Sequence, residues 1–186
     1  MASLRPGSQR ALSASSGSLE RDQFAALYQE FLPRVLNYLR VRVGDEALAE
    51  ELTAGAFAQA YAKRHQLRNA AAFPGWLFRI AHNEMAQYFR RQAKRGARAV
   101  DFDFLAALPT PDLAPDEVIA QQQQAQAMLR ALQTLPPREQ EILDLKFVAG
   151  LSNVQVAEAI GLTPSNVGVI VFRALRKLRL EIVAEP

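Results

Sequence analysis

The sequence predicts an all-α protein with two small helical domains. Apolar residues recur at three- and four-residue steps along most of the chain, which is the spacing of amphipathic helices. No stretch shows the strict alternation of polar and apolar residues that a half-buried strand requires. The helical segments fall into two groups, separated by an acidic stretch that contains prolines. Because 49% of the 186 residues are apolar, each group can bury a core of its own.

Four parts are expected along the chain. The tail is rich in serine and lacks an apolar face, so we expect it to be disordered, with an organellar transit peptide as the alternative. The linker is acidic and has no sustained period. The predicted boundaries are 1–21 for the tail, 22–95 for the first helical domain, 96–117 for the linker and 118–183 for the second helical domain.

Three helices are expected in the first domain. The first begins at Asp22 and ends at Gly44, and Pro33 is predicted to kink it or to divide it into two consecutive helices. Asp45 is a typical cap for the second helix, and Pro74 suits the first turn of the third. The residues expected to face inward from the third helix are Trp76, Leu77, Ile80, Ala81, Met85 and Tyr88.

The second domain is expected to contain a helix that follows the Leu-Pro-Pro sequence at 135–137. Proline suits the first turn of a helix and glycine suits its end, so this helix should finish at Gly150. Its apolar residues Ile142, Leu143 and Phe147 are expected to contribute to the core.

Two helices joined by a glycine turn are predicted next. Ser152 and Gln155 have the spacing of a capping box, which marks the start of a short helix. Gly161 tolerates the positive φ of a tight turn, and Thr163 with Pro164 begins the last helix. Such a helix-turn-helix places its second helix in the major groove of DNA.

Composition excludes several classes of function. With no cysteine the chain has neither disulfides nor thiolate metal sites, and its two histidines lie in unrelated segments. It carries no glycine-rich phosphate loop and no metalloprotease motif, so we expect no catalysis and no cofactor. No apolar run approaches the roughly 18 residues of a membrane span, so we expect a cytoplasmic protein without membrane contact of its own.

Charge is distributed unevenly, although the net charge is only +3. Residues 79–98 hold six lysines and arginines and a single acid, whereas 101–120 hold five acids and no base. This pattern indicates either two different electrostatic partners or one block that folds against the other.

Three segments, in order, resemble the extracytoplasmic-function (ECF) sigma factors of bacterial RNA polymerase. AEELTAGAFAQAYAKR at 49–64 is similar to their polymerase-binding helix. FPGWLFRIAHNEMAQYFRRQAKR at 73–95 is similar to the segment that melts the promoter and reads its minus-ten element. LPPREQEILDLKFVAGLSNVQVAEAIGLTPSNVGVIVFRALRKLR at 135–179 resembles their carboxyl-terminal domain. The resemblance covers roughly residues 22–182.

The resemblance implies a protein that binds core RNA polymerase and promoter DNA and is controlled by an anti-sigma factor. It assigns polymerase binding to the helix at 45–63, although acidic residues there also suit a solvated face and the helix dipole. Ala54-Gly55 stands where the family commonly has Gln-Glu. The polymerase-binding residues implied are Glu50, Glu51, Leu52 and Phe57.

The segment at 73–95 has the chemistry needed to open DNA. Its basic side chains can neutralise phosphates, and Phe78, His82, Tyr88 and Phe89 are candidates for stacking on unpaired bases. The alternative is that its aromatic residues form the core, as is usual at helical spacing. By resemblance, the polar loop at 64–72 captures an extruded base, with a solvated loop as the alternative. The minus-ten candidates are Arg64, His65, Gln66, Arg68, Asn69, Arg79, His82, Asn83, Tyr88, Arg90, Arg91, Lys94 and Arg95.

The last helix raises the question of how it reads DNA. Gly168, Val169 and Ile170 occupy positions expected to face outward, yet they have no side-chain hydrogen-bonding groups. Asparagine can pair with adenine and arginine with guanine, so we expect neighbouring polar residues to read the bases. The minus-thirty-five candidates are Thr163, Ser165, Asn166, Arg173, Arg176 and Lys177.

Two other functions remain open from the sequence. One is a dimeric regulator whose helix-turn-helix reads an operator, although such a protein has no need of a melting segment at 73–95. The other is an RNA-binding or structural helical protein whose basic block contacts RNA.

Overall fold

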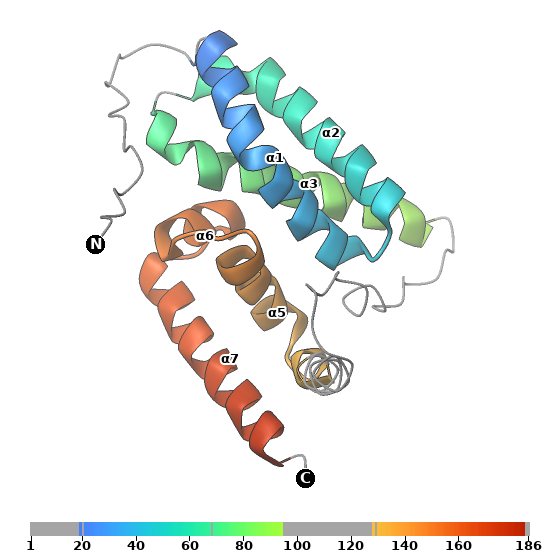
Figure 1. Cartoon of the computed structure of the whole chain (residues 1–186), viewed down its shortest axis with the longest axis vertical. Helices are drawn as coiled ribbons and strands as arrows, with labels where there is room; N and C mark the ends of the chain where they lie inside the picture. The colour runs from blue at the N-terminus through green and yellow to red at the C-terminus, as the bar shows by residue number, and fades with distance from the viewer. Residues whose placement is uncertain (1–18, 20, 68, 95–127, 129, 185–186) are drawn as a thin grey trace, which may run out of the picture.

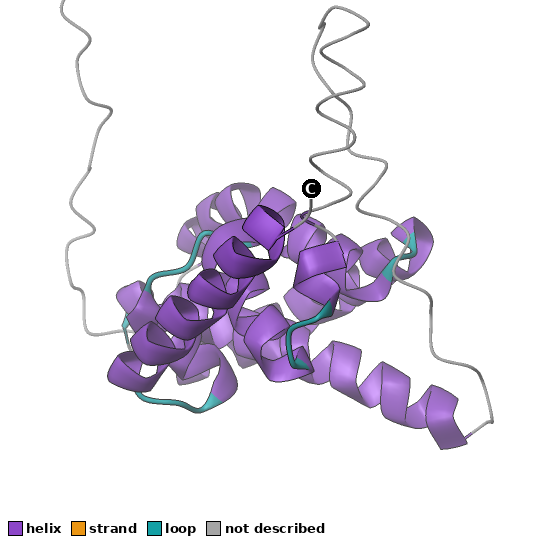
Figure 2. Ribbon diagram, turned by 90° about the horizontal axis from the view of Figure 1, so that it is seen from below, coloured by secondary structure: helices purple, strands orange, loops and turns teal. Residues whose placement is uncertain are grey.

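The computed structural model describes two helical domains, and the described part of the chain contains helices and no strand (Figures 1 and 2). The predicted all-α fold is confirmed. The predicted linker and nearly all of the predicted tail lie outside the described residues. The described residues are 19, 21–67, 69–94, 128 and 130–184.

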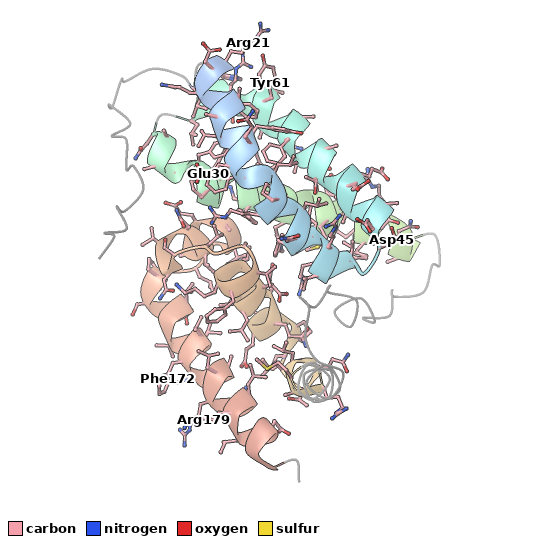
Figure 3. All side chains as sticks on the ribbon, in the orientation of Figure 1. Arg21, Glu30, Asp45, Tyr61, Phe172 and Arg179 are labelled. Carbon is pink, nitrogen blue, oxygen red and sulfur yellow. The ribbon has the colours of Figure 1, made fainter. Side chains whose placement is uncertain are left out.

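Three long helices form the amino-terminal domain, residues 21–94, and each packs against the other two (Figure 1). Arg21 lies beside Tyr61 and donates a hydrogen bond to its hydroxyl over 3.4 Å, which joins the start of the first helix to the end of the second (Figure 3). The elements are α1 (Arg21–Val43), α2 (Glu46–Lys63), η1 (Arg64–Gln66), η2 (Ala70–Ala72) and α3 (Phe73–Lys94).

Pro33 does not divide α1, which runs as one helix from Arg21 to Val43. Of the two predicted alternatives, two consecutive helices was therefore wrong, while a kink at Pro33 stays a prediction. Pro33 is exposed, so the backbone carbonyl that loses its partner can be hydrated, while Phe31 and Val35 on either side are buried. The predicted break after α1 is confirmed, because Gly44 has a φ of 67°.

The carboxyl-terminal domain, residues 130–184, contains the helix-turn-helix. α6 and α7 are joined by Gly161, whose φ of 72° confirms the predicted left-handed turn. The capping box is also present: Ser152 Oγ accepts from Gln155 N, and Gln155 Oε1 accepts from Ser152 N. The elements are α5 (Pro137–Leu143), η4 (Asp144–Val148), α6 (Asn153–Ile160) and α7 (Pro164–Ala184).

Removing the cap of α6 should weaken the fold measurably. Ser152→Ala is expected to lower the free energy of unfolding by about 1 kcal/mol, because Gln155 N loses its side-chain acceptor. Urea unfolding followed by circular dichroism measures this loss. Ser165→Ala, an exposed serine inside α7, is the matched control and should change the free energy by less than about 0.5 kcal/mol. Equal effects of the two substitutions would contradict the role of the cap.

A π-helical turn continues α5. In η4 the amide of Ala149 donates to the carbonyl of Asp144, five residues earlier, over 2.9 Å. This turn contains one residue more than the same turn of an α-helix would. Phe147, which lies within it, is exposed. The prediction that Phe147 contributes to the core with Ile142 and Leu143 was therefore wrong for Phe147, whereas the other two are buried.

The cores of the two domains are continuous. Phe73 is fully buried and makes ring contacts with Phe24, Phe31 and Trp76 in the amino-terminal domain. Buried residues of α1, α2 and α3 join those of α5, η4, α6 and the start of α7 in a single cluster. A smaller cluster lies between α5 and α7. The domains therefore pack directly on one another, with α6 against α3 and η4 against α1 (Figure 1).

Candidate nucleic-acid interface

Polar and basic side chains follow one exposed face of α3. Arg79, Asn83 and Arg90 recur at four- and seven-residue steps, so they lie on the same side of the helix. Arg91 and Lys94 are exposed at its carboxyl-terminal end. We call these five residues the α3 basic face. Its four positive charges can neutralise DNA phosphates, and its asparagine can accept and donate hydrogen bonds.

The aromatic residues of α3 divide into core and surface. Phe78 is completely buried and makes an edge contact with the Tyr38 ring, so it is a core residue and the proposal that it stacks on bases is corrected. Tyr88 and Phe89 are only half-buried, and their rings contact each other. The Tyr88 hydroxyl accepts a hydrogen bond from Gln92 over 2.8 Å. Tyr88 and Phe89 also pack against the large core, so they lie at the boundary between core and surface.

The loop between α2 and α3 presents several polar groups. The Arg64 guanidinium lies 4.1 Å from the centre of the Tyr61 ring and donates to the Tyr61 carbonyl, so it is held in place. His65 and Gln66 are exposed. Asn69 is exposed. Its side-chain oxygen accepts a hydrogen bond from the backbone amide of Ala71, and Asn69 thereby caps η2. The two minus-ten candidates that lie outside the described residues are Arg68 and Arg95.

His82 does not join the α3 basic face but points to the other domain. Its Nδ1 lies 2.6 Å from Oε1 of Glu141 on α5. Burial acts to raise the pKa of Glu141, but His82, Arg42 and Arg138 outweigh it and hold that pKa below its usual range. Asp144 lies 3.3 Å from Arg42, yet burial prevails and raises its pKa. His82 thus lies beside the charged groups of Glu141, Asp144, Arg42 and Arg138, where the two domains meet.

The minus-thirty-five candidates lie on exposed positions of the helix-turn-helix. Thr163 Oγ1 accepts from the Asn166 amide over 3.3 Å and caps α7. Lys177 donates to both carboxylate oxygens of Glu139 on α5, so it is tied within the domain. The exposed candidates are Thr163, Ser165, Asn166, Arg173, Arg176 and Lys177.

The orientation of α7 differs from the expectation that Gly168, Val169 and Ile170 all face outward. A Cβ on Gly168 would lie 3.4 Å from Asn153 of α6, so Gly168 faces the first helix of the helix-turn-helix. Ile170 is half-buried and packs on the large core. Val169 is exposed, and so is Phe172, which projects from the outer side of α7 near Arg179 (Figure 3). Polar and apolar groups therefore share the outer face.

The polymerase-binding candidates on α2 also divide between surface and core. Glu50 and Glu51 are exposed, whereas Leu52 is 5% exposed and Phe57 is 4% exposed. Buried side chains support the helix and offer no surface to a partner, so we correct the candidate polymerase surface to exclude Leu52 and Phe57.

Sequence reasoning missed the basic residues of α1 that lie at the domain interface. Arg34 Nε donates to the Ala149 carbonyl over 2.9 Å, and its Nη2 donates to the Gly150 carbonyl over 3.0 Å. Arg42 lies against Asp144. These pairs join positions more than a hundred residues apart, so no local pattern in the sequence could have indicated them.

Within the described residues, no single helix is long and apolar enough to cross a membrane. α6 and residues 164–181 of α7 pass the test of length and composition as a pair, but the chain bends by 104° between them.

The basic helix face and the helix-turn-helix together define a DNA-binding protein. The sigma-70 region 2 family matches residues 27–95, and the sigma-70 region 4 family matches residues 125–178. The chain is 29% identical to the ECF sigma factor BldN of Streptomyces coelicolor, over 86% of this chain and 60% of BldN. It is 30% identical to the sigma factor CarQ of Myxococcus xanthus, over 86% of this chain and 88% of CarQ.

The fold is also that of a solved sigma factor. The structure of RpoE from Bartonella quintana, in complex with the anti-sigma factor NepR, matches with a TM-score of 0.65 at 21% identity, over 89% of this chain and 99% of that one. The chain belongs to the ECF sigma factors of bacterial RNA polymerase. Sigma factors direct promoter-specific transcription initiation and are not enzymes.

Proposed function

We propose that the amino-terminal domain contacts and melts the minus-ten element through the α3 basic face and the loop at 64–72. Two observations support this proposal. The four basic side chains of the α3 basic face are exposed, and the same helix carries the half-buried rings of Tyr88 and Phe89. Cations hold the DNA backbone, and aromatic rings replace the stacking that a melted base loses. His65, Gln66 and Asn69 supply hydrogen-bonding groups for an extruded base.

The helix-turn-helix would recognise the minus-thirty-five element. Ser165 and Asn166 lie in the first turn of α7, where helix-turn-helix proteins contact base edges. Arg173 follows about two turns later and is exposed. Arg176 is better suited to a phosphate, which positions the helix without reading sequence.

The acidic surface of α2 at Glu50 and Glu51 would bind core RNA polymerase. Both carboxylates are exposed, and the helix beneath them is anchored by the buried Leu52 and Phe57. RpoE was solved with the anti-sigma factor NepR, and we propose that an anti-sigma factor also controls this chain. We place the chain in the cytoplasm, where bacterial polymerase transcribes DNA.

Reconstitution tests the proposed function. The purified chain should form a complex with bacterial core RNA polymerase and start run-off transcription on fragments of its own genome. Glu50→Lys combined with Glu51→Lys should abolish complex formation, whereas Glu30→Lys on the exposed part of α1 should preserve it. Transcription that is equally strong without the added chain would reject the proposal.

Binding to a single-stranded minus-ten oligonucleotide should depend on the α3 basic face. Arg90→Ala is expected to weaken binding and to reduce the slope of log affinity against log salt by about 0.7, because one phosphate contact is lost. Fluorescence anisotropy at several salt concentrations measures both quantities. Arg179→Ala on the other domain is the control and should leave the slope unchanged. A larger effect of Arg179→Ala would place this DNA on α7 instead.

A further inference from the structure

Two consecutive residues in the first turn of α5 hold the two helices of the helix-turn-helix. Arg138 Nη2 donates a hydrogen bond over 3.0 Å to the carbonyl of Ile160, the last residue of α6. Glu139 accepts from Lys177 of α7 with both carboxylate oxygens, at 2.8 and 3.0 Å. One side chain therefore joins α5 to α6, and the next joins it to α7. We call these two contacts the α5 brace.

The Arg138 contact secures the end of α6. The last carbonyls of a helix have no partner within the helix, so they need one from elsewhere. A guanidinium at this end makes a charge-assisted hydrogen bond and also complements the helix dipole. Because the chain turns towards α7 directly after Ile160, at Gly161, the contact holds α6 at the turn itself.

The Glu139 contact neutralises a cation on the helix that would read DNA. The Glu139 side chain is 19% exposed and that of Lys177 is 50% exposed, so the pair is partly shielded from water. Between described residues, α7 forms a single ion pair, and it uses Lys177. Lys177 follows Arg176 directly and lies one turn after Arg173. Its charge is thus balanced within the domain, beside two exposed arginines that would contact DNA.

A free lysine at this position would favour binding without selectivity. Contacts to phosphates supply essentially all non-specific binding to DNA, and each adds about 0.9 to the slope of log affinity against log salt. Adjacent residues of a helix point about 100° apart, so Lys177 and Arg176 face different directions. A complex held in register by base contacts gains less from Lys177 than a complex that is free to reorient on any sequence.

We propose that Glu139 determines the specificity of this sigma factor for the minus-thirty-five element: it keeps Lys177 off the DNA backbone and, with Arg138, fixes α6 and α7 for reading. Glu139 acts through Lys177 and does not touch DNA, so it is a positioning residue. Lys177 then serves the α5 brace and makes no phosphate contact in the parent chain. The inference rests on the proposed recognition of this element by the helix-turn-helix.

Glu139→Gln tests the inference, because it keeps the size of the side chain and removes its charge. On a duplex of random sequence, the freed Lys177 should steepen the slope of log affinity against log salt by about 0.9 and raise affinity about fivefold at about 0.1 M salt. The preference for a minus-thirty-five duplex over the random duplex should fall about threefold or more. Fluorescence anisotropy of the full chain at several salt concentrations measures all three quantities.

Two further variants separate the release of Lys177 from a general change of charge. Glu181→Gln removes the same charge from an exposed position of α7, and it should leave the slope unchanged. Lys177→Gln should also leave the parent slope unchanged, whereas Arg176→Ala should reduce it by about 0.9. Adding Lys177→Gln to Glu139→Gln should restore the parent slope, which completes a double-mutant cycle.

The outcomes distinguish this inference from the proposed function. A parent chain that does not prefer the minus-thirty-five duplex over the random duplex would refute the proposed function. With that preference present, the inference is overturned by an unchanged slope in Glu139→Gln, by an excess slope that survives Lys177→Gln, or by an unchanged preference. If circular dichroism shows that Glu139→Gln does not fold, Lys177→Gln decides alone: a slope reduced as in Arg176→Ala would mean that Lys177 already contacts phosphates.

Discussion

Phe73→Ala is expected to lower the free energy of unfolding by about 3–5 kcal/mol, because it removes a large ring from a tightly packed core. The Phe73 side chain is completely buried, and its ring contacts Phe24, Phe31 and Trp76 at centroid distances of 6.0, 5.6 and 6.1 Å. These partners cannot close the resulting cavity without moving α1 relative to α3. Chemical denaturation at equilibrium, followed by circular dichroism, measures the loss.

Phe172→Ala is the matched control for this prediction. It removes the same ring from a position on α7 that is 69% exposed, so it should change the free energy of unfolding by less than about 0.5 kcal/mol. A loss from Phe172→Ala similar to that from Phe73→Ala would show that the outer face of α7 is covered in solution. A small loss from Phe73→Ala would show that the core described around Phe73 is not the one that stabilises the chain.

Arg173→Ala is expected to weaken binding to the minus-thirty-five element by about 1–3 kcal/mol, the range of one bidentate contact between arginine and guanine. Arg173 is exposed on the outer face of α7. The loss should be largest on DNA that carries a guanine at the contacted position and should shrink when that base pair is changed. Competition binding with a set of single-base variants of the promoter measures both effects.

Val169→Ala is the appropriate control for Arg173→Ala. Val169 is exposed one turn earlier on α7, whereas Ile170 packs on the core and its loss would also destabilise the domain. Val169→Ala should weaken binding less than Arg173→Ala does, since it removes only methyl groups. Equal or reversed effects would mean that a different face of α7 enters the groove.

Local features of the fold were predictable because each depends on a few neighbouring residues. Gly44, Gly150 and Gly161 were expected to end helices, and they have φ values of 67°, 65° and 72°. The capping box at Ser152 and the start of α7 follow from equally local chemistry. The family resemblance depended on three such segments in a given order, and the region 2 and region 4 matches confirm it.

Which side of each helix faces the core was predictable only in part. Apolar spacing identified α2 and α7 as helices. The family resemblance, however, assigned polymerase binding to Leu52, which is buried, and Gly168 was expected on the outer face, whereas it faces α6. Which side of a helix is covered depends on its partners, and Phe147, which lies in the π-helical turn η4, is exposed. A one-residue change of register cannot be recognised from apolar spacing alone.

The domain interface could not be predicted at all. The basic and acidic blocks of the sequence suggested that one might fold against the other, but the acidic residues at 101–120 lie outside the described residues. The contacts that are described join Arg34, Arg42 and His82 to residues of the other domain. Nothing in the neighbourhood of Arg34 distinguishes it from a solvated arginine, because its partners are backbone carbonyls 115 and 116 positions away.

Trp76 is the single tryptophan of the chain, and it adjoins Gly75, where α3 packs against α6. Its indole is half-buried against the Phe73 ring. The emission of an indole depends on the polarity and the quenching groups around it, so ultraviolet fluorescence of the unlabelled protein is sensitive to events at this junction. The molecule thus carries a built-in optical probe, which allows stopped-flow kinetics to be recorded on the unmodified chain as polymerase, promoter or inhibitor is added.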